Sequence, residues 1–251
     1  MAKLPGNGRF LSAPDPRDEA EKAASLTQSS LFRDATAPAL AMAMEAAVVR
    51  HFHANEVIFR EGEEGEAVYL IHKGSVKISR SNLKGKERIF TILPPGEVVG
   101  EMALVAETPR NATALCLDAV TTVALYRQDL RPILNRFPQL LWNLAAILAR
   151  RLADSNREVE VLSTASTQAC VAHALLTLYR RSAFEIAEDG SMVISFTHQD
   201  LAARTGNSRE TVTRVLREFE AGGVVSTRPG AIKLLRPEAL DDIIYGLRET
   251  D

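Results

Sequence analysis

The stretch Thr197–Glu220, THQDLAARTGNSRETVTRVLREFE, decides how the C-terminal part of this chain folds. Its first four residues, Thr197–Asp200, form a capping box, which predicts the start of a short helix. Small Ala202 allows two helices to approach each other, and Gly206, four residues later, supplies a left-handed turn. Apolar Val212, six residues further on, anchors a second helix. This spacing predicts two helices joined by a tight turn.

The second helix, expected to begin near Ser208, has an apolar side and a basic side. Arginine can pair bidentately with guanine, and glutamate can accept from the cytosine amino group. Arg209 and Glu210 lie in the first turn, where recognition helices contact base edges. We therefore predict DNA binding over the alternative of a merely solvated face. The expected DNA-contacting residues are Thr197, Gln199, Ser208, Arg209, Glu210, Thr213, Arg214 and Arg217.

The segments around this pair of helices complete a small domain. CVAHALLTLYRR, residues 170–181, predicts a helix before it, and EDGSMVISF, residues 188–196, predicts a turn and a strand. GVVSTRPGAIKLL, residues 223–235, predicts a hairpin after it, with two apolar strands around a Pro-Gly turn. We expect a winged helix-turn-helix over residues 166–251.

A long helix is expected over residues 138–165, with proline at its start. Apolar residues recur along it at alternating steps of four and three, which is the pattern of a two-helix coiled coil and predicts a homodimer. Packing on its own barrel is the alternative, and Leu144, Ile147 and Trp142 are expected to serve it on a neighbouring face. The seam consists of Leu141, Ala145, Leu148, Leu152, Ser155, Val159 and Leu162. Ser155 is its one hydroxyl and lies beside Asn156, so we expect a ligand to satisfy these polar groups.

Short alternating strands fill residues 54–126, and glycines fall at the breaks between them. This pattern predicts a β-barrel or jelly roll, with a hairpin turn at residues 81–88 and a short helix at residues 129–137. Residues 1–28 contain proline, glycine and charge, and we expect them to form a flexible tail. The expected fold class is therefore α+β.

Composition excludes several classes of protein. With 251 residues the chain is long enough for two domains. It has no apolar run of about 18 residues and no segment like a signal peptide, so we expect a cytoplasmic protein without a membrane partner. Its net charge of −2 argues against a surface that coats nucleic acid broadly. Cys116 and Cys170 are expected to be buried free thiols, and two cysteines are too few for a cysteine-ligated iron–sulfur cluster. The five histidines match no metal motif, so no metal site is expected.

A second stretch, Gly100–Ala114 with the sequence GEMALVAETPRNATA, places a carboxylate and a guanidinium across a short apolar loop. The carboxylate belongs to Glu101 and the guanidinium to Arg110. One interpretation is an internal ion pair between them. The other is a ligand site that uses both.

Together the two stretches resemble the catabolite activator / fumarate-nitrate regulator superfamily of bacterial transcription factors. GNSRETVTRVLREFE is close to the recognition helix of the catabolite activator branch, and GEMALVAETPRNAT resembles the phosphate-binding cassette of cyclic-nucleotide-binding domains. The resemblance covers about residues 31–235 in the same order. It implies a cyclic-nucleotide-binding β-barrel over 29–137, a dimerisation helix over 138–165, the winged helix-turn-helix, and RNA polymerase as a further partner.

The resemblance also implies roles for the cassette. Arg110 would neutralise the cyclic phosphate, Glu101 would accept from the ribose 2′-OH, and backbone N–H groups from Gly100 to Ala103 would complete an anion nest. Asn111 departs from the usual small residue after the arginine, and Ser155 with Asn156 replaces a hydroxyl pair. We favour cAMP, and cGMP remains open. The implied ligand-binding residues are Gly100, Glu101, Met102, Ala103, Arg110, Asn111, Ser155 and Asn156.

Two other functions compete with this interpretation. A protein of the same fold could sense haem or redox state, but intact Glu101 and Arg110 argue against both. An enzyme such as a phosphodiesterase would need a metal cluster, a nucleophile–base pair or a Walker motif, none of which appears. We therefore expect a regulator rather than an enzyme, with an operator similar to a TGTGA palindrome.

Overall fold

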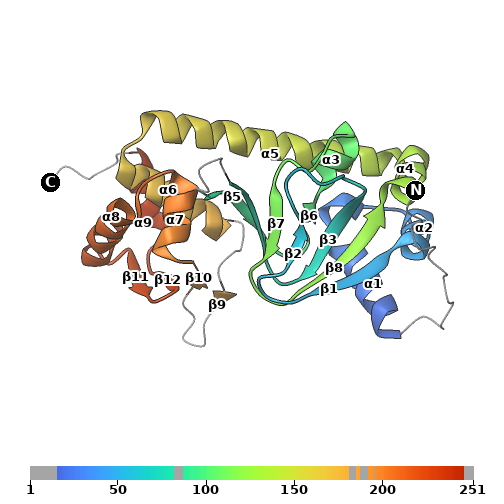
Figure 1. Ribbon diagram of the computed structural model, residues 1–251, viewed down its shortest axis with the longest axis horizontal. Helices are drawn as coiled ribbons and strands as arrows, with labels where there is room; N and C mark the ends of the chain where they lie inside the picture. The colour runs from blue at the N-terminus through green and yellow to red at the C-terminus, as the bar shows by residue number, and fades with distance from the viewer. Residues whose placement is uncertain (1–15, 82–86, 181–184, 187–191, 195, 246–251) are drawn as a thin grey trace, which may run out of the picture.

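The computed structural model describes residues 16–81, 87–180, 185–186, 192–194 and 196–245. The chain forms an N-terminal effector domain and a C-terminal domain, and the long helix α5 (Pro138–Thr164) runs along both of them (Figure 1). The predicted turn at 81–88, the turn before 192 and the first half of the predicted tail fall largely outside the described residues. No helix in the described ranges has the length and apolar character needed to cross a membrane.

The effector domain is built on two four-stranded antiparallel sheets, in the orders β1-β8-β3-β6 and β2-β7-β4-β5. The strands alternate buried and partly exposed residues: in β7, Ala114 and Cys116 are fully buried, whereas Thr113 and Leu115 are partly exposed. The expected fold is confirmed as a two-sheet jelly roll, not a closed barrel. The strands are β1 (Val48–Phe52), β2 (Val57–Phe59), β3 (Ala67–Lys73), β4 (Val76–Ser81), β5 (Glu87–Leu93), β6 (Val98–Val99), β7 (Thr113–Cys116) and β8 (Val120–Tyr126).

Helices cover one side of this sandwich. They are α1 (Pro16–Gln28), η1 (Ser30–Phe32), α2 (Ala37–Ala46) and α4 (Arg127–Arg136), while the short α3 (Glu101–Ala106) lies in the cassette. Leu26, Leu31 and Phe32 are almost fully buried in the same core as β3 and β8. The prediction of a flexible tail over residues 1–28 is therefore wrong for Pro16–Gln28, because the apolar end of this segment packs on the sheet.

Helix α5 begins at Pro138, as expected, and has two apolar sides. Leu144 and Ile147 are buried in the effector-domain core. The seam residues Leu152 and Val159 are 63% and 66% exposed, whereas the seam residue Leu148 is half-buried against the effector-domain core, so only part of the predicted seam faces away from the helix's own domain. Trp142 is 74% exposed, so the expectation that it packs on the barrel is wrong. The Leu162 side chain lies outside the described residues.

The C-terminal domain combines helices with a four-stranded sheet in the order β11-β12-β10-β9. Helix α6 follows α5, the helix-turn-helix consists of α7 and α8, and the predicted hairpin forms the wing, β11 and β12. The elements are α6 (Thr167–Arg180), β9 (Glu185–Ile186), β10 (Met192–Ile194), α7 (His198–Thr205), α8 (Arg209–Ala221), β11 (Val225–Arg228), β12 (Ala231–Leu234) and α9 (Glu238–Tyr245).

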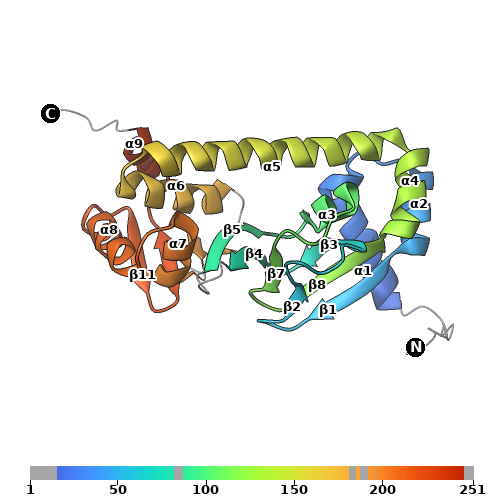
Figure 2. The same cartoon turned by 45° about the horizontal axis from the view of Figure 1, so that its top comes forward.

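Strand β5 joins the two domains. Its residues Ile89 and Ile92 are buried in one cluster with the core of α6, α7 and α8. Arg204 of α7 donates to the backbone carbonyl of Phe90. Figure 2 shows β5 reaching from the effector domain toward α6 and α7. The C-terminal domain therefore rests directly on a strand of the jelly roll.

Candidate ligand cavity and nucleic-acid interface

A cavity of about 670 Å³ lies between the cassette, α5 and the C-terminal domain. Its size falls in the range of roughly 300–1,000 Å³ that is typical of small-molecule sites. Both candidate residues from the cassette, Glu101 and Arg110, line it, and so does Ser155 from α5. The structure thus brings together residues that are more than 40 positions apart in the sequence.

Arg110 is a buried cation held by neutral groups. Its side chain is only 4% exposed, and its two Nη atoms donate to the carbonyl oxygens of Gly100 (2.7 Å) and Ala67 (2.6 Å). Its guanidinium lies 4.2 Å from the centre of the Phe59 ring, a cation–π arrangement. Its Nε has no hydrogen-bond partner among the described residues. Burial lowers the pKa of Arg110, against the opposing charges of Tyr69 and Glu101. A buried guanidinium with a free N–H is suited to receive an anion.

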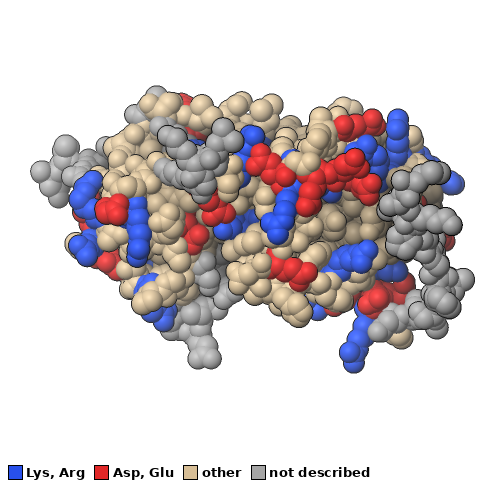
Figure 3. Space-filling view, viewed as in Figure 1, with Lys and Arg blue, Asp and Glu red and all other residues tan. Residues whose placement is uncertain are grey.

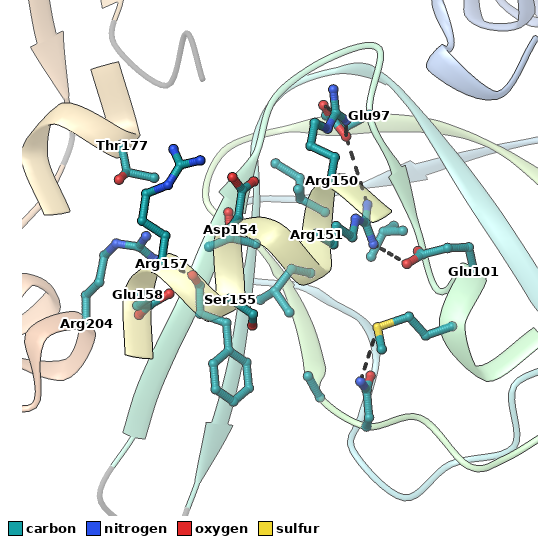
Figure 4. A pocket seen from close by; sticks show the side chains of 18 of the residues that line it. Glu97, Glu101, Arg150, Arg151, Asp154, Ser155, Arg157, Glu158, Thr177 and Arg204 are labelled. Carbon is teal, nitrogen blue, oxygen red and sulfur yellow. Dashed lines mark hydrogen bonds and ion pairs between the residues drawn. The ribbon is translucent and has the colours of Figure 1, made fainter. Parts of the chain in front are cut away.

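Glu101 lies on the same cavity and is 1% exposed. One carboxylate oxygen accepts from Arg151 of α5, and the other, Oε2, is buried without a hydrogen-bond partner among the described residues. No Glu101–Arg110 ion pair occurs in this part of the chain, so the internal-pair interpretation fails. Figure 4 shows Arg151 reaching from α5 to Glu101. Glu101 therefore keeps one acceptor available for a hydroxyl group.

The backbone of Gly100 explains why glycine opens the cassette. Its φ of 87° lies in the left-handed region, and a Cβ there would collide with the Arg110 guanidinium. The following residues, Met102 and Ala103, line the cavity, and the Asn111 amide donates to the Met102 sulfur at 3.4 Å. All the predicted cassette residues thus gather at one end of the cavity.

The two polar residues predicted on α5 are placed differently. Ser155 lines the cavity, whereas Asn156 is exposed and does not line the cavity of its own chain. Both lie beside the exposed seam formed by Leu152 and Val159. Asn156 is therefore placed toward the side on which a partner helix would pack.

Arg151 is a cavity-lining residue that the sequence analysis did not single out. It binds Glu101 and the carbonyl of Val98, and it lies 3.9 Å from Glu97, which also pairs with Arg150 at 2.9 Å. A signal was available, because Arg151 precedes Ser155 by four residues and such pairs share one helix face. Its partner lies 50 residues away, which local spacing does not reveal.

The helix-turn-helix is confirmed in its details. Thr197 and Asp200 form the capping box, Gly206 has a φ of 74°, and Ser208 caps α8 through Thr211 N–H. Ala202 and Val212 are buried between the helices, at 2% and 0% exposure. Small, left-handed and apolar residues thus occupy the positions that the spacing predicts.

The outer face of α8 presents the predicted basic residues to solvent. Arg209, Glu210 and Arg217 are exposed, while Arg214 is exposed but paired with Glu218 at 2.7 Å. Thr213 is partly buried, and its hydroxyl donates to the Arg209 carbonyl and contacts His198. The remaining predicted contacts, Thr197, Gln199 and Ser208, are exposed around the same turn.

Charge is unevenly distributed over the molecule. Figure 3 shows Lys and Arg side chains at the end formed by α8 and the wing, and over the effector domain a cluster of acidic side chains together with further Lys and Arg. This distribution explains how a chain with a net charge of −2 can still present a basic surface.

The structure also shows where the cysteines lie and which side chains come close enough together to hold a metal ion. Cys116 and Cys170 are buried free thiols, as expected, and burial raises the pKa of Cys116 to about 11. Among the described residues, the side chains of Asp18, Glu21 and His51 lie close enough for a metal ion. Within this group Glu21 lies 3.7 Å from His51, and it also lies 3.5 Å from Lys73.

Two known domain families match the chain. The cyclic nucleotide-binding domain matches residues 49–137, and the Crp-like helix-turn-helix domain matches residues 171–243. The matched ranges coincide with the jelly roll and the winged domain.

Relatives match over most of the length. The cyclic AMP receptor protein of Thermus thermophilus is 36% identical over 219 residues, which cover 87% of this chain and 98% of the relative. A CRP-like cAMP-activated global transcriptional regulator of Mycobacterium tuberculosis is 29% identical and covers 86% and 96%. The cAMP-activated global transcriptional regulator CRP of Escherichia coli is 28% identical and covers 87% and 99%.

Solved structures agree with this match. A transcriptional regulator of the CRP/FNR family from Thermus thermophilus aligns with a TM-score of 0.67 at 29% identity, covering 79% of this chain and 98% of that one. The catabolite activator protein of Thermus thermophilus aligns with a TM-score of 0.50 at 35% identity, covering 88% and 100%.

Proposed function

The chain belongs to the CRP/FNR superfamily of transcriptional regulators, and on this premise we propose that it is a homodimer whose DNA binding is controlled by cAMP. The domain matches make it a CRP-like regulator with a cyclic nucleotide-binding domain and a helix-turn-helix, in a family of regulators rather than enzymes.

One observation carries the effector proposal. Within one cavity, the buried Arg110 Nε–H and one buried carboxylate oxygen of Glu101 have no hydrogen-bond partner among the residues that the structure describes. A cyclic nucleotide offers a phosphate to the first and a ribose 2′-OH to the second. Binding both groups would satisfy two buried polar atoms at once, which makes the recognition strong and specific.

The purine would be recognised from α5. Ser155 lines the cavity of its own chain, and Asn156 faces the side expected to meet a partner. An asparagine amide can accept from the adenine amino group or donate to guanine O6, so chemistry allows cAMP and cGMP. The relatives named for cyclic AMP support cAMP.

The dimer is proposed from the exposed seam of α5. A solvent-exposed row that includes Leu152 and Val159 favours burial against a second copy. Two-fold symmetry then places two recognition helices for half-sites about 34 Å apart. A regulator of this kind would act in the cytoplasm together with RNA polymerase.

We propose that each half-site resembles TGTGA. Arg209 would pair with a guanine, Glu210 would accept from a cytosine amino group, and Arg214 would exchange its Glu218 partner for the next base. A selection from random DNA duplexes at saturating cAMP should recover an inverted repeat of this kind. Recovery of an unrelated site would contradict these base contacts and leave the effector proposal intact.

Calorimetric titration of cAMP and of cGMP into the purified protein tests the effector proposal. We expect one nucleotide per chain, with tighter binding of cAMP. Binding of neither nucleotide would overturn the proposal. A Soret band in the absorption spectrum would indicate haem sensing instead.

A further inference from the structure

Arg127, the first residue of α4, reaches two segments that frame the ligand cavity. One of its Nη atoms donates to the carbonyl oxygen of Gly65 (2.8 Å), in the loop between β2 and β3, and to that of Ala103 (3.3 Å), in α3. Its backbone N–H donates to the carbonyl of Glu66 at 2.7 Å. Arg127 itself does not line the cavity. An effect of Arg127 on ligand binding would therefore be exerted through the residues that it holds, or through its charge.

The loop between β2 and β3 holds the backbone of Arg110. The Gly62 N–H donates to the Arg110 carbonyl, and the Arg110 N–H donates to the Glu63 carbonyl, both at 2.8 Å. These two bonds fix the point from which the Arg110 side chain enters the cavity. Because Arg127 holds the same loop at Gly65, it supports Arg110 indirectly.

The second segment, α3, begins with Glu101, and Arg127 holds this helix at the Ala103 carbonyl. The loop and α3 touch at Gly65, where an added Cβ would come within 2.5 Å of the Ala103 side chain. Glycine there allows the two segments to lie against each other, and the Arg127 guanidinium bridges them. The spacing between Arg110 and Glu101 therefore depends on this contact.

The surroundings of the Arg127 guanidinium distinguish it from the paired arginines of the surface. Within the described residues its side chain donates to neutral carbonyl oxygens, and its Nε is buried without a hydrogen-bond partner. Its charge also acts on Arg110, whose pKa is lowered first by burial and further by Arg127. An anion bound at Arg110 would offset this repulsion, so charge alone is the alternative explanation for Arg127.

We propose that Arg127 is a positioning residue for the ligand. Its guanidinium holds the loop between β2 and β3 and α3 at the spacing that lets Arg110 bind the phosphate and Glu101 bind the ribose of one nucleotide together. This inference rests on the effector proposal and adds a residue to it. Two contacts to one ligand reinforce each other only when the binding groups are correctly spaced. Loss of Arg127 should therefore weaken both contacts and uncouple the ribose contact from the phosphate contact.

Calorimetric titration of cAMP and of 2′-deoxy-cAMP into wild type and Arg127→Gln tests this role. Arg127→Gln should bind cAMP at least about tenfold more weakly, the effect expected from losing roughly one or two hydrogen bonds. Its preference for cAMP over 2′-deoxy-cAMP should fall at least about threefold, because the ribose no longer meets Glu101 correctly. A residue that only stabilised the fold would lower the melting temperature and leave this preference unchanged.

Arg127→Lys separates position from charge, since lysine keeps the charge without the reach of the guanidinium. It should also lose part of the preference for cAMP, and it carries the same comparison if Arg127→Gln does not fold. Arg131→Gln is the matched control, because it removes a charge from the next turn of α4, where Arg131 is exposed and lies 3.6 Å from Glu107. It should bind both nucleotides like the wild type. An unchanged preference in Arg127→Gln, or wild-type behaviour of Arg127→Lys, would overturn the proposal.

Hydrogen–deuterium exchange without nucleotide separates this proposal from the effector proposal. Arg127→Gln should speed exchange in the peptides that contain Gly62 and Arg110, whereas Arg131→Gln should not. Unchanged exchange in Arg127→Gln would overturn the positioning role whatever the nucleotide titrations show. Failure of the wild type to bind either nucleotide would refute the effector proposal, and faster exchange in Arg127→Gln would still support the structural part of this one.

Discussion

At the residue scale, Arg110 is the group on which nucleotide binding depends most. Arg110→Ala should weaken cAMP binding by about 3 kcal/mol or more, because a buried phosphate charge would lose its partner. Calorimetry measures this loss directly. The same change also frees the carbonyls of Gly100 and Ala67, so a lower melting temperature is expected, and circular dichroism must show that the variant is folded. Near wild-type affinity in a folded variant would contradict the assignment.

Glu101 should determine selectivity for the ribose. Wild-type protein should bind cAMP more tightly than 2′-deoxy-cAMP by about 1.5–3 kcal/mol, the range for hydrogen bonds to charged groups. In Glu101→Ala the two nucleotides should bind with nearly equal affinity, since the acceptor is gone. Calorimetric titration of cAMP and of 2′-deoxy-cAMP into wild type and into Glu101→Ala measures all four affinities that this comparison needs. Persistent discrimination in the variant would show that another group recognises the 2′-OH.

The sequence is informative about these two residues for a physical reason. A carboxylate and a guanidinium across an apolar loop indicate either an ion pair or a ligand site, and the resemblance to the phosphate-binding cassette favoured the ligand site at Glu101 and Arg110. Arg151 could not be assigned to Glu101, because their contact depends on where α5 crosses the cassette.

At the element scale, we expect different residues of α5 to support dimerisation and to couple the nucleotide site to DNA binding. Leu152→Ala should weaken the dimer, since burial of a leucine is worth about 1.5–3 kcal/mol per chain. Ser155→Ala should leave the dimer intact but reduce the coupling between cAMP and DNA by about 1 kcal/mol, within the usual range of coupling energies. Analytical ultracentrifugation measures the first effect, and DNA titrations with and without cAMP measure the second. Equal coupling in Ser155→Ala and wild type would show that Ser155 does not transmit the effect of cAMP to DNA binding.

Elements with strong local patterns could be predicted, and weaker ones could not. The capping box at Thr197, the left-handed Gly206 and the heptad steps of α5 each follow from short-range chemistry. Helix α1 was missed because its composition is polar and its stability comes from Leu26 docking on the sheet. Trp142 was expected to pack on the effector domain. It follows the exposed Leu141 by one position, which is about 100° around the helix, and it lies on the solvent side.

At the scale of the whole molecule, the junction between the domains lies on β5. Ile89 and Ile92 lie three residues apart in β5, and the pairing of β5 with β4 is irregular between them, so regular strand alternation does not predict that both pack in the core with α7. The arrangement of the two domains therefore required the structure. Gly206 lies at the same junction, with an ideal Cβ position 3.6 Å from the Arg88 guanidinium.

Histidine protonation should make the whole fold less stable in acid. Burial, with neighbouring cations, lowers the pKa values of His72, His173 and His198 below 6.5. Because the unfolded chain takes up protons first, the free energy of unfolding should fall as pH decreases through about 6.5 toward the folded-state values. Urea unfolding between pH 7.5 and pH 5 measures the slope. His173→Gln should reduce this slope, and an unchanged slope in His173→Gln would show that His173 is not its source.

Control of DNA binding by a cyclic nucleotide is the central claim for the whole molecule. The most direct test is the fluorescence anisotropy of a labelled duplex carrying the TGTGA inverted repeat, titrated with protein in the presence and absence of cAMP. Wild-type protein should bind this duplex about 5–150-fold more tightly with cAMP, the usual span of allosteric coupling. Arg110→Ala should bind it equally under both conditions. Wild-type affinity that does not change with cAMP would contradict the account.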